Sequence, residues 1–183
     1  HRDLHLLSRL QRKMSISDRT WNSAFSVELE RIASKASLEI RKNTDEDIKI
    51  RQVTVKQLPS FSFLSPSAYP LSGGLTVTDT RSFSTPVSIA GEKDVPSGYP
   101  YTSVVQGKNS FILPEYIWDN TAGKGRASFM EIEAERNGAS ETWQILLGKS
   151  TDIPADYSLG RNTYYRYMLT VNPLNVCLLY TSD

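Results

Sequence analysis

Residues 129–135 read FMEIEAE, and this stretch decides the fold class. Apolar and acidic residues alternate strictly along it, and side chains with a period of two lie on opposite faces of a β-strand. A row of carboxylates can be catalytic, but glutamates two apart on a strand more often form a solvated face. The stretch therefore predicts a half-buried strand that turns Glu131, Glu133 and Glu135 toward water.

The same alternation recurs on both sides of this strand. It predicts further strands at residues 36–41, 48–58, 110–113, 142–147 and 164–171. In the first of these, Ser37, Glu39 and Arg41 are expected on the solvated face. In the second, the apolar phase changes at Arg51 and Gln52, which predicts a β-bulge because one inserted residue exchanges the two faces.

Helical periodicity is confined to residues 3–14, where apolar residues recur at steps of three and four. Turn residues fill 64–74 and, around a short segment at 87–89, most of 78–98. These signals predict an all-β protein of four parts. The parts are an N-terminal helical arm (1–20), a partial N-terminal β domain (21–72), a C-terminal β-sandwich domain (73–175) and a tail (176–183).

Composition excludes several classes of function. The 183 residues carry 21 Lys and Arg against 20 Asp and Glu, so no global field attracts nucleic acid or an anionic membrane. No apolar run reaches the roughly 18 residues that a membrane helix needs. One cysteine, Cys177, excludes an internal disulfide, and the two histidines, His1 and His5, lie at the N-terminus. No metal site and no cofactor are predicted.

Motifs of catalysis fail on inspection. Residues 148–150, Gly-Lys-Ser, would end a phosphate-binding loop only if Gly stood where Trp143 stands. Glu115 and Asp119 are the best pair of carboxylates for glycoside hydrolysis, but their spacing in sequence does not fix the spatial separation that this chemistry requires. We therefore predict that the chain is not an enzyme and has no catalytic residue.

Three segments, in order, resemble the fimbrillin superfamily of Bacteroidales, the Mfa-like and FimB-like proteins of type V pili. Residues 29–35 (LERIASK) are similar to its "LxRxxAK" segment, and residues 110–116 (SFILPEY) to its "F-Y-L-P-E-N" segment, with Tyr116 in place of Asn. Gly148 followed by residues 157–165 (YSLGRNTYY) resembles the closing "LG…Y-x-L-x-R-N-x-x-Y" pattern. Within it, Asn162 suits a left-handed turn residue and Arg161 a loop cap.

The resemblance implies transthyretin-like antiparallel β-sandwich domains in tandem, of which the first is incomplete here. It implies a structural or accessory subunit of a cell-surface fimbrium that binds other subunits by β-strand donation and supports adhesion to host or bacterial surface ligands. It also implies export to the outer membrane as a lipoprotein, with the signal peptide and the lipid anchor upstream of residue 1.

A second function remains open. Exposed aromatic side chains can stack on sugar rings, and Tyr116, Trp118 and Trp143 are the candidates for a glycan-binding β-sandwich module. A coplanar exposed set favours glycan binding, whereas buried rings beside an unpaired sheet edge favour the fimbrial function. Finally, residues 176–183 (VCLLYTSD) resemble a translated sequencing adapter, and we expect this tail to be an artefact.

Overall fold

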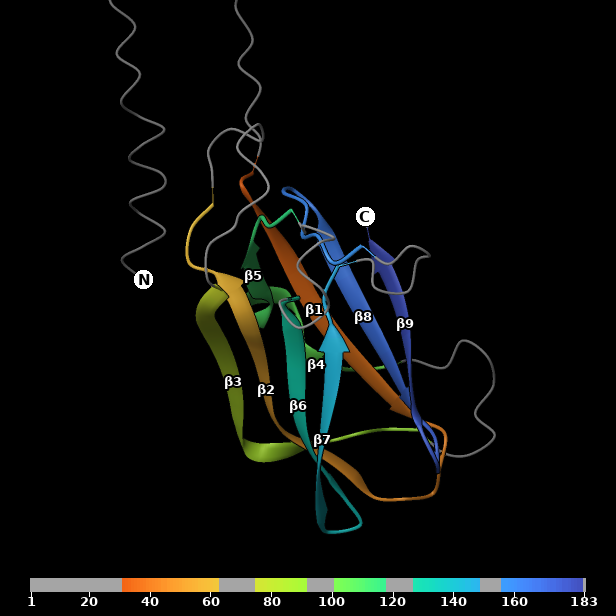
Figure 1. The fold of residues 1–183 in the computed structure, drawn as a ribbon. Helices are drawn as coiled ribbons and strands as arrows, with labels where there is room; N and C mark the ends of the chain where they lie inside the picture. The colour runs from red at the N-terminus through yellow and green to blue at the C-terminus, as the bar shows by residue number, and fades with distance from the viewer. Residues whose placement is uncertain (1–30, 63–74, 92–100, 118–126, 149–155, 183) are drawn as a thin grey trace, which may run out of the picture.

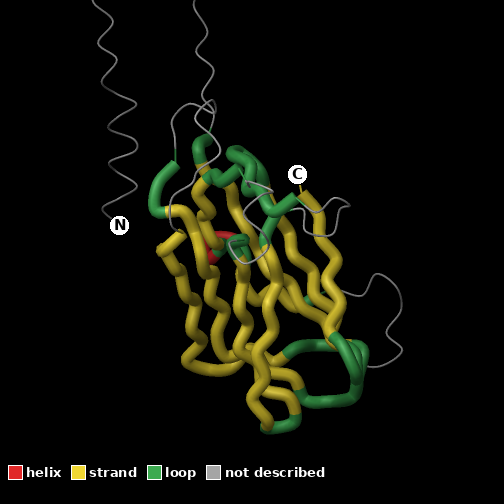
Figure 2. The backbone as a smooth tube through the Cα atoms, viewed as in Figure 1, coloured by secondary structure: helices red, strands yellow, loops and turns green. Residues whose placement is uncertain are grey.

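Two β-sheets lie face to face in this computed structural model, which describes residues 31–62, 75–91, 101–117, 127–148 and 156–182 (Figures 1 and 2). The strands are β1 (Ala33–Lys42), β2 (Ile48–Pro59), β3 (Leu75–Ser88), β4 (Thr102–Val105), β5 (Phe111–Pro114), β6 (Phe129–Arg136), β7 (Ala139–Leu146), β8 (Tyr164–Val171) and β9 (Val176–Ser182). One 3-10 turn, Gly107–Asn109, joins β4 to β5. The all-β sandwich predicted from the alternation is confirmed.

The first sheet, called sheet A, has the order β4-β1-β8-β9, with β5 also paired to β1. The short strands β4 and β5 share one edge of β1, because each covers a different half of it. On its other edge β1 runs parallel to β8, whereas β9 returns antiparallel to β8. The sandwich is therefore antiparallel except at this central pair.

The second sheet, called sheet B, has the order β3-β2-β6-β7 and is antiparallel throughout. Its register confirms the predicted bulge. Ile50 is opposite Ala134 while Gln52 is opposite Glu133, so Arg51 is the extra residue on β2. The apolar set of β2 changes phase at this residue and stays on the inner face.

The core lies between the sheets and follows the alternation. On β8 the residues Tyr165, Tyr167, Leu169 and Val171 are buried and their neighbours are half-buried. Inward side chains on β1, β2, β5 and β6 complete the layer, among them Leu38, Ile40, Ile50, Val53, Phe111, Leu113, Met130 and Ile132, all at 0% exposure. Removing this apolar area from water supplies most of the driving force for folding.

Three of the sequence predictions require correction. The boundary between residues 72 and 73 is wrong as a domain division, because β1 pairs with β4, β5 and β8 and β2 pairs with β3 and β6. The loop predicted over 78–98 is instead β3 up to Ser88. Its apolar residues share one parity but are sparse, because Asp79, Arg81 and Thr85 interrupt the series, and an edge strand tolerates exposed polar residues.

The third correction concerns β1, which was expected to be half-buried. Ser37 and Glu39 point away from the core and are nonetheless 0% and 8% exposed. β1 is a central strand, and longer side chains of β8 lie over its short outward ones: the Tyr164 hydroxyl is 3.0 Å from the Ser37 hydroxyl.

Two other predictions concern the ends of the chain. The helix predicted over 3–14 lies outside the described residues. The tail at 176–183 is paired as β9 over Val176–Ser182. Within the described ranges, no helix has the length and the apolar character needed to cross a membrane.

Candidate functional site

One side of the sandwich is open between two sheet edges. β7 ends sheet B and β9 ends sheet A, and both lie on the same side of the molecule (Figure 1). A groove of ≈ 460 Å³ runs there, and we call this groove with its two edge strands the seam. No strand in the described part of the chain pairs with the outer edge of β7 or of β9.

The walls of the seam are mostly apolar side chains that belong to the core or pack against its margin. Trp143 and Ile145 project inward from β7 because they are opposite the buried Ile132 and Met130 of β6. Leu178 of β9 is opposite Leu169 of β8 and faces them, and Tyr157 adds a further wall. A groove of this composition beside free backbone edges suits an extended peptide segment.

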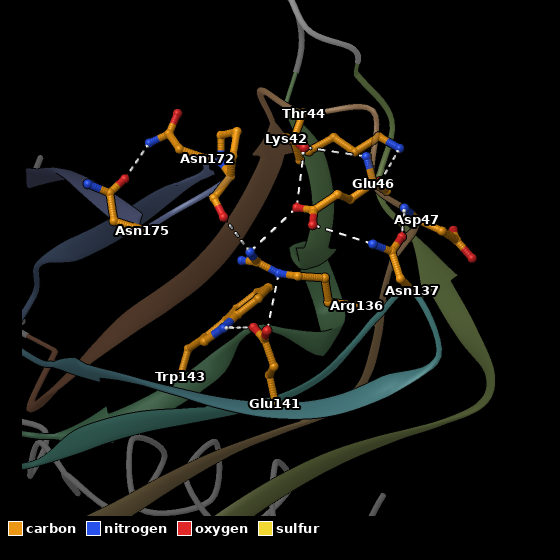
Figure 3. A network of polar contacts seen from close by, with 11 residues as sticks. Lys42, Thr44, Glu46, Asp47, Arg136, Asn137, Glu141, Trp143, Asn172 and Asn175 are labelled. Carbon is orange, nitrogen blue, oxygen red and sulfur yellow. Dashed lines mark hydrogen bonds and ion pairs between the residues drawn. The ribbon is translucent and has the colours of Figure 1, made fainter.

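Trp143 is held in place by a polar network at the end of the seam (Figure 3). Its indole N–H donates to the Glu141 carboxylate at 3.0 Å, and that carboxylate lies 3.2 Å from the guanidinium of Arg136. Arg136 also lies 3.4 Å from Glu46 and donates to the Pro173 carbonyl at 3.0 Å. One guanidinium thus joins the β1–β2, β6–β7 and β8–β9 turns.

The β6–β7 turn is fixed by a second set of contacts in the same network. Asn137 adopts a φ of 50° and Gly138 a φ of 84°, which closes the tight hairpin. The Asn137 side-chain oxygen accepts from the Asp47 backbone N–H at 2.9 Å, and the Asn137 backbone N–H donates to the Asp47 carbonyl at 2.9 Å. The hairpin turn that precedes the edge strand β7 is therefore anchored to the β1–β2 turn.

A second cluster lies at the opposite end of β1, where the fimbrillin-like segments meet. The Arg161 Nε donates to the Glu115 carboxylate at 2.9 Å, and the side chains are 8% and 5% exposed. Beside them Tyr116 and Leu159 exchange backbone hydrogen bonds of 2.9 and 2.7 Å. The cluster therefore joins the segment after β5 to the turn before β8.

The turn that carries Arg161 is also closed by backbone contacts. Asn162 has a φ of 53°, so the predicted left-handed conformation is confirmed. Its N–H donates to the Ala33 carbonyl at 3.1 Å. The Tyr165 hydroxyl accepts from the Gly160 N–H at 2.7 Å, and burial raises the pKa of Tyr165 above its ordinary value of 10.0, although this hydrogen bond opposes the shift. Tyr165 therefore stays neutral at physiological pH.

The structure shows why the closing pattern has glycine at position 148. Gly148 has a φ of 83°, and its N–H donates to the Tyr167 hydroxyl at 3.1 Å. A Cβ at this position would lie 2.6 Å from the Tyr157 backbone carbon. Only glycine fits, because both the conformation and the space exclude a side chain.

The predicted glycan-stacking set is not assembled as an exposed platform. Tyr116 is 2% exposed, so its ring cannot stack on a sugar. Trp118 lies outside the described residues. Trp143 belongs to the edge strand β7, and its half-buried side chain lines the seam.

The candidate catalytic carboxylates also have other roles or lie outside the described residues. Glu115 is paired with Arg161, and Asp119 is outside the described ranges. The glutamates of β6 face outward as predicted and contact Lys56, Gln52 and Arg51. Hydrogen bonding to Lys56 holds the pKa of Glu131 below its ordinary value of 4.5. Among the described residues, no group of three His, Cys, Asp or Glu side chains could hold a metal ion.

Sequence reasoning missed the seam and the Arg136 network. Predicting the seam requires the order of the strands in each sheet, and the alternation of apolar and polar residues does not reveal that order. The network carried one weak signal, because Glu141 and Trp143 are two residues apart and so share a face of β7.

Comparison with known proteins gives likeness in structure alone. No family model and no curated protein matches the sequence. The tip fimbrial protein Mfa3 of Porphyromonas gingivalis, solved with a C-terminal truncation, is similar with a TM-score of 0.53 and 14% identity over 86% of this chain and 52% of that one. A candidate cell adhesion protein of Parabacteroides distasonis is similar with a TM-score of 0.53 and 10% identity over 84% of this chain and 52% of that one. The chain thus has the fold found in about half the length of these proteins.

Proposed function

We propose that this chain is a structural or accessory subunit of a bacterial cell-surface fimbrium that supports adhesion. The fold it shares with a tip fimbrial protein and with a candidate cell adhesion protein supports this role. The fimbrillin-like segments support it independently, because the Glu115–Arg161 pair and the Tyr116–Leu159 bridge join two of them in space.

The observation that carries the mechanism is the seam. We infer that another fimbrial subunit donates an extended segment to it, which adds a strand to a sheet edge and inserts alternate side chains into the groove. Backbone hydrogen bonds to the edge would supply affinity. The apolar walls formed by Trp143, Ile145 and Leu178 would select apolar side chains at every second position.

The location follows from this role as part of the same proposal. A fimbrial subunit is exported, and the membrane attachment we propose is a lipid anchor on the segment that precedes residue 1. Glycan binding remains the second candidate, but the burial of Tyr116 and the position of Trp143 in the groove do not favour it. The half-buried Trp143 ring in a groove beside a sheet edge that no described strand pairs is the arrangement expected of a strand acceptor.

Assembly in a fimbriated Bacteroidales host tests the proposal. The full-length gene, tagged on the encoded domain, is expressed and the tag is located by immunogold electron microscopy. A W143K/V176K variant places two charges at half-buried positions of the seam, and V77K, at an exposed apolar position of β3 (43%), is the matched control. We expect label on surface fimbriae for the wild type and V77K and its loss for W143K/V176K. Equal labelling of all three would rule out the seam as the acceptor, and label confined to the cytoplasm would rule out the fimbrial role.

A further inference from the structure

The outer face of sheet A carries two cations, Lys35 and Arg41, that form no ion pair with a described residue. Lys35 and Arg41 point outward from β1, and in the described part of the chain neither has an acidic side chain within ion-pair distance. Each lies instead over an aromatic ring. The Lys35 ammonium is 5.5 Å from the centre of the Tyr164 ring, and the Arg41 guanidinium is 4.8 Å from that of Tyr101.

The rings position these charges without cancelling them. A cation over an aromatic face is attracted by the ring quadrupole and keeps its full charge. Arg41 is restrained further because its Nε donates to the Thr170 hydroxyl at 3.0 Å, and the Tyr101 hydroxyl lies 3.4 Å from the same oxygen. The two cations are therefore ordered before any ligand arrives, which lowers the entropy cost of binding an anion.

The outer face of sheet B shows the opposite arrangement. There Lys49, Arg51 and Lys56 project from β2, and each forms an ion pair with a carboxylate: Lys49 with Asp47, Arg51 with Glu135 and Lys56 with Glu131. The two faces thus differ in how their cations are held rather than in how many they carry. Among the described residues on these two outer faces, Lys35 and Arg41 of sheet A are cations without an ion pair, whereas the three cations of β2 all have one.

A third cation completes the row on sheet A. Arg166 of β8 is opposite Ser37, between Lys35 and Arg41 along the strand, and its side chain is 40% exposed. It forms an ion pair with Glu39 at 3.3 Å, and Glu39, at 8% exposure, is an acidic side chain that the described residues place on this face. Lys35 and Arg41 are six residues apart, which is roughly 20 Å along a strand. The row of Lys35, Arg166 and Arg41 together with Glu39 therefore carries a net charge of +2, because three cations stand against one carboxylate.

We propose that this row, Lys35, Arg166 and Arg41, binds a linear sulfated polysaccharide. The ligand must carry several negative charges along roughly 20 Å, because the cations are spread along one strand. An acidic peptide is less suited, since both edges of β1 are already paired and offer it no backbone hydrogen bonds. Side-chain cations alone would hold the ligand, and sulfate groups supply a charge for each of them.

Heparin affinity chromatography tests the proposal on the purified chain. The test variant is K35Q/R41Q. The control is K49Q/R51Q, which likewise removes one lysine and one arginine, but from the outer face of sheet B. We expect the wild type and the control to bind alike and K35Q/R41Q to bind about tenfold more weakly, with a shallower dependence of affinity on salt. K35Q alone should give a smaller loss and keeps the test valid if the double variant does not fold.

Three results would overturn the proposal. The wild type could fail to bind heparin at physiological salt, or both double variants could lose affinity equally, which would indicate attraction by net charge alone. Poly-L-glutamate could also compete as well as heparin, which would assign the face to an acidic polypeptide. The proposal does not depend on the fimbrial function, since the chain can bind heparin whether or not its seam accepts a strand.

Discussion

Glu115 and Arg161 are 46 residues apart in sequence, and their side chains form an ion pair that is almost entirely excluded from water. The pair joins the segment after β5 to the turn before β8. Removing one member leaves the charge of the other in a site that excludes water, so this contact should be sensitive to substitution.

Removing one member of this pair should destabilise the protein strongly. We expect E115Q and R161Q each to lower the free energy of unfolding in urea by about 3–5 kcal/mol, because each leaves or weakens a buried charge. The double variant E115L/R161M should lose less than either single variant. The control is R51Q, which removes an arginine whose side chain is 54% exposed and should cost about 1 kcal/mol or less. Equal losses for R51Q and R161Q would contradict the role of burial.

Two glycines with nearly the same φ provide a matched test of close packing. Gly148 and Gly138 have φ of 83° and 84°, but an added Cβ meets the Tyr157 backbone at the first and nothing within 4 Å at the second. We expect G138A to cost about 1–3 kcal/mol from backbone strain. G148A should cost about 1–3 kcal/mol more because of the overlap. Thermal unfolding of both variants decides this, and similar midpoints would contradict it.

Asn162 should tolerate glycine and reject a β-branched residue. Its φ of 53° is favourable for Gly and Asn and strained for Val. We expect N162G to change the free energy of unfolding little and N162V to lower it by about 1–3 kcal/mol. The Asn162 N–H can bond to the Ala33 carbonyl in every variant, so the comparison isolates the conformation.

The Lys56–Glu131 contact should make stability depend on pH. Because Lys56 holds the pKa of Glu131 below 4.5 in the folded state, the contact stabilises above 4.5 and its contribution is lost as pH falls through the folded pKa. The difference in urea stability between the wild type and K56Q should therefore shrink from pH 7 to about pH 3. In an E131Q background K56Q should show no such trend, and a difference that persists at acid pH would disprove the linkage.

Sequence predicted those elements whose two faces differ. The strand with Glu131, Glu133 and Glu135 and the bulge at Arg51 were predictable because each leaves a trace in the apolar phase. β3 was not, since polar residues interrupt the apolar phase of this edge strand between Val77 and Phe83. The single sandwich was missed because a Pro- and Gly-rich loop looks the same between domains as between two strands of one sheet.

The candidate site was less predictable for a related reason. Trp143 was recognised as chemically distinctive, but its place in a groove depends on which strand ends each sheet. The cations of the two outer faces look alike in sequence. Only strand pairing shows that Arg51 meets a carboxylate while Arg41 meets a ring.

The parallel pairing of β1 with β8 governs when the domain can finish folding. Arg41 and Thr170 form a hydrogen bond although they are 129 residues apart in sequence. A ribosome must therefore synthesise almost the whole domain before sheet A can close. Sheet B draws on β2, β3, β6 and β7 and can assemble earlier. Until β8 arrives, the nascent chain displays one edge of β1 together with the apolar inner face of sheet B. Such a high-contact-order topology folds slowly and needs protection from aggregation while the chain is being made.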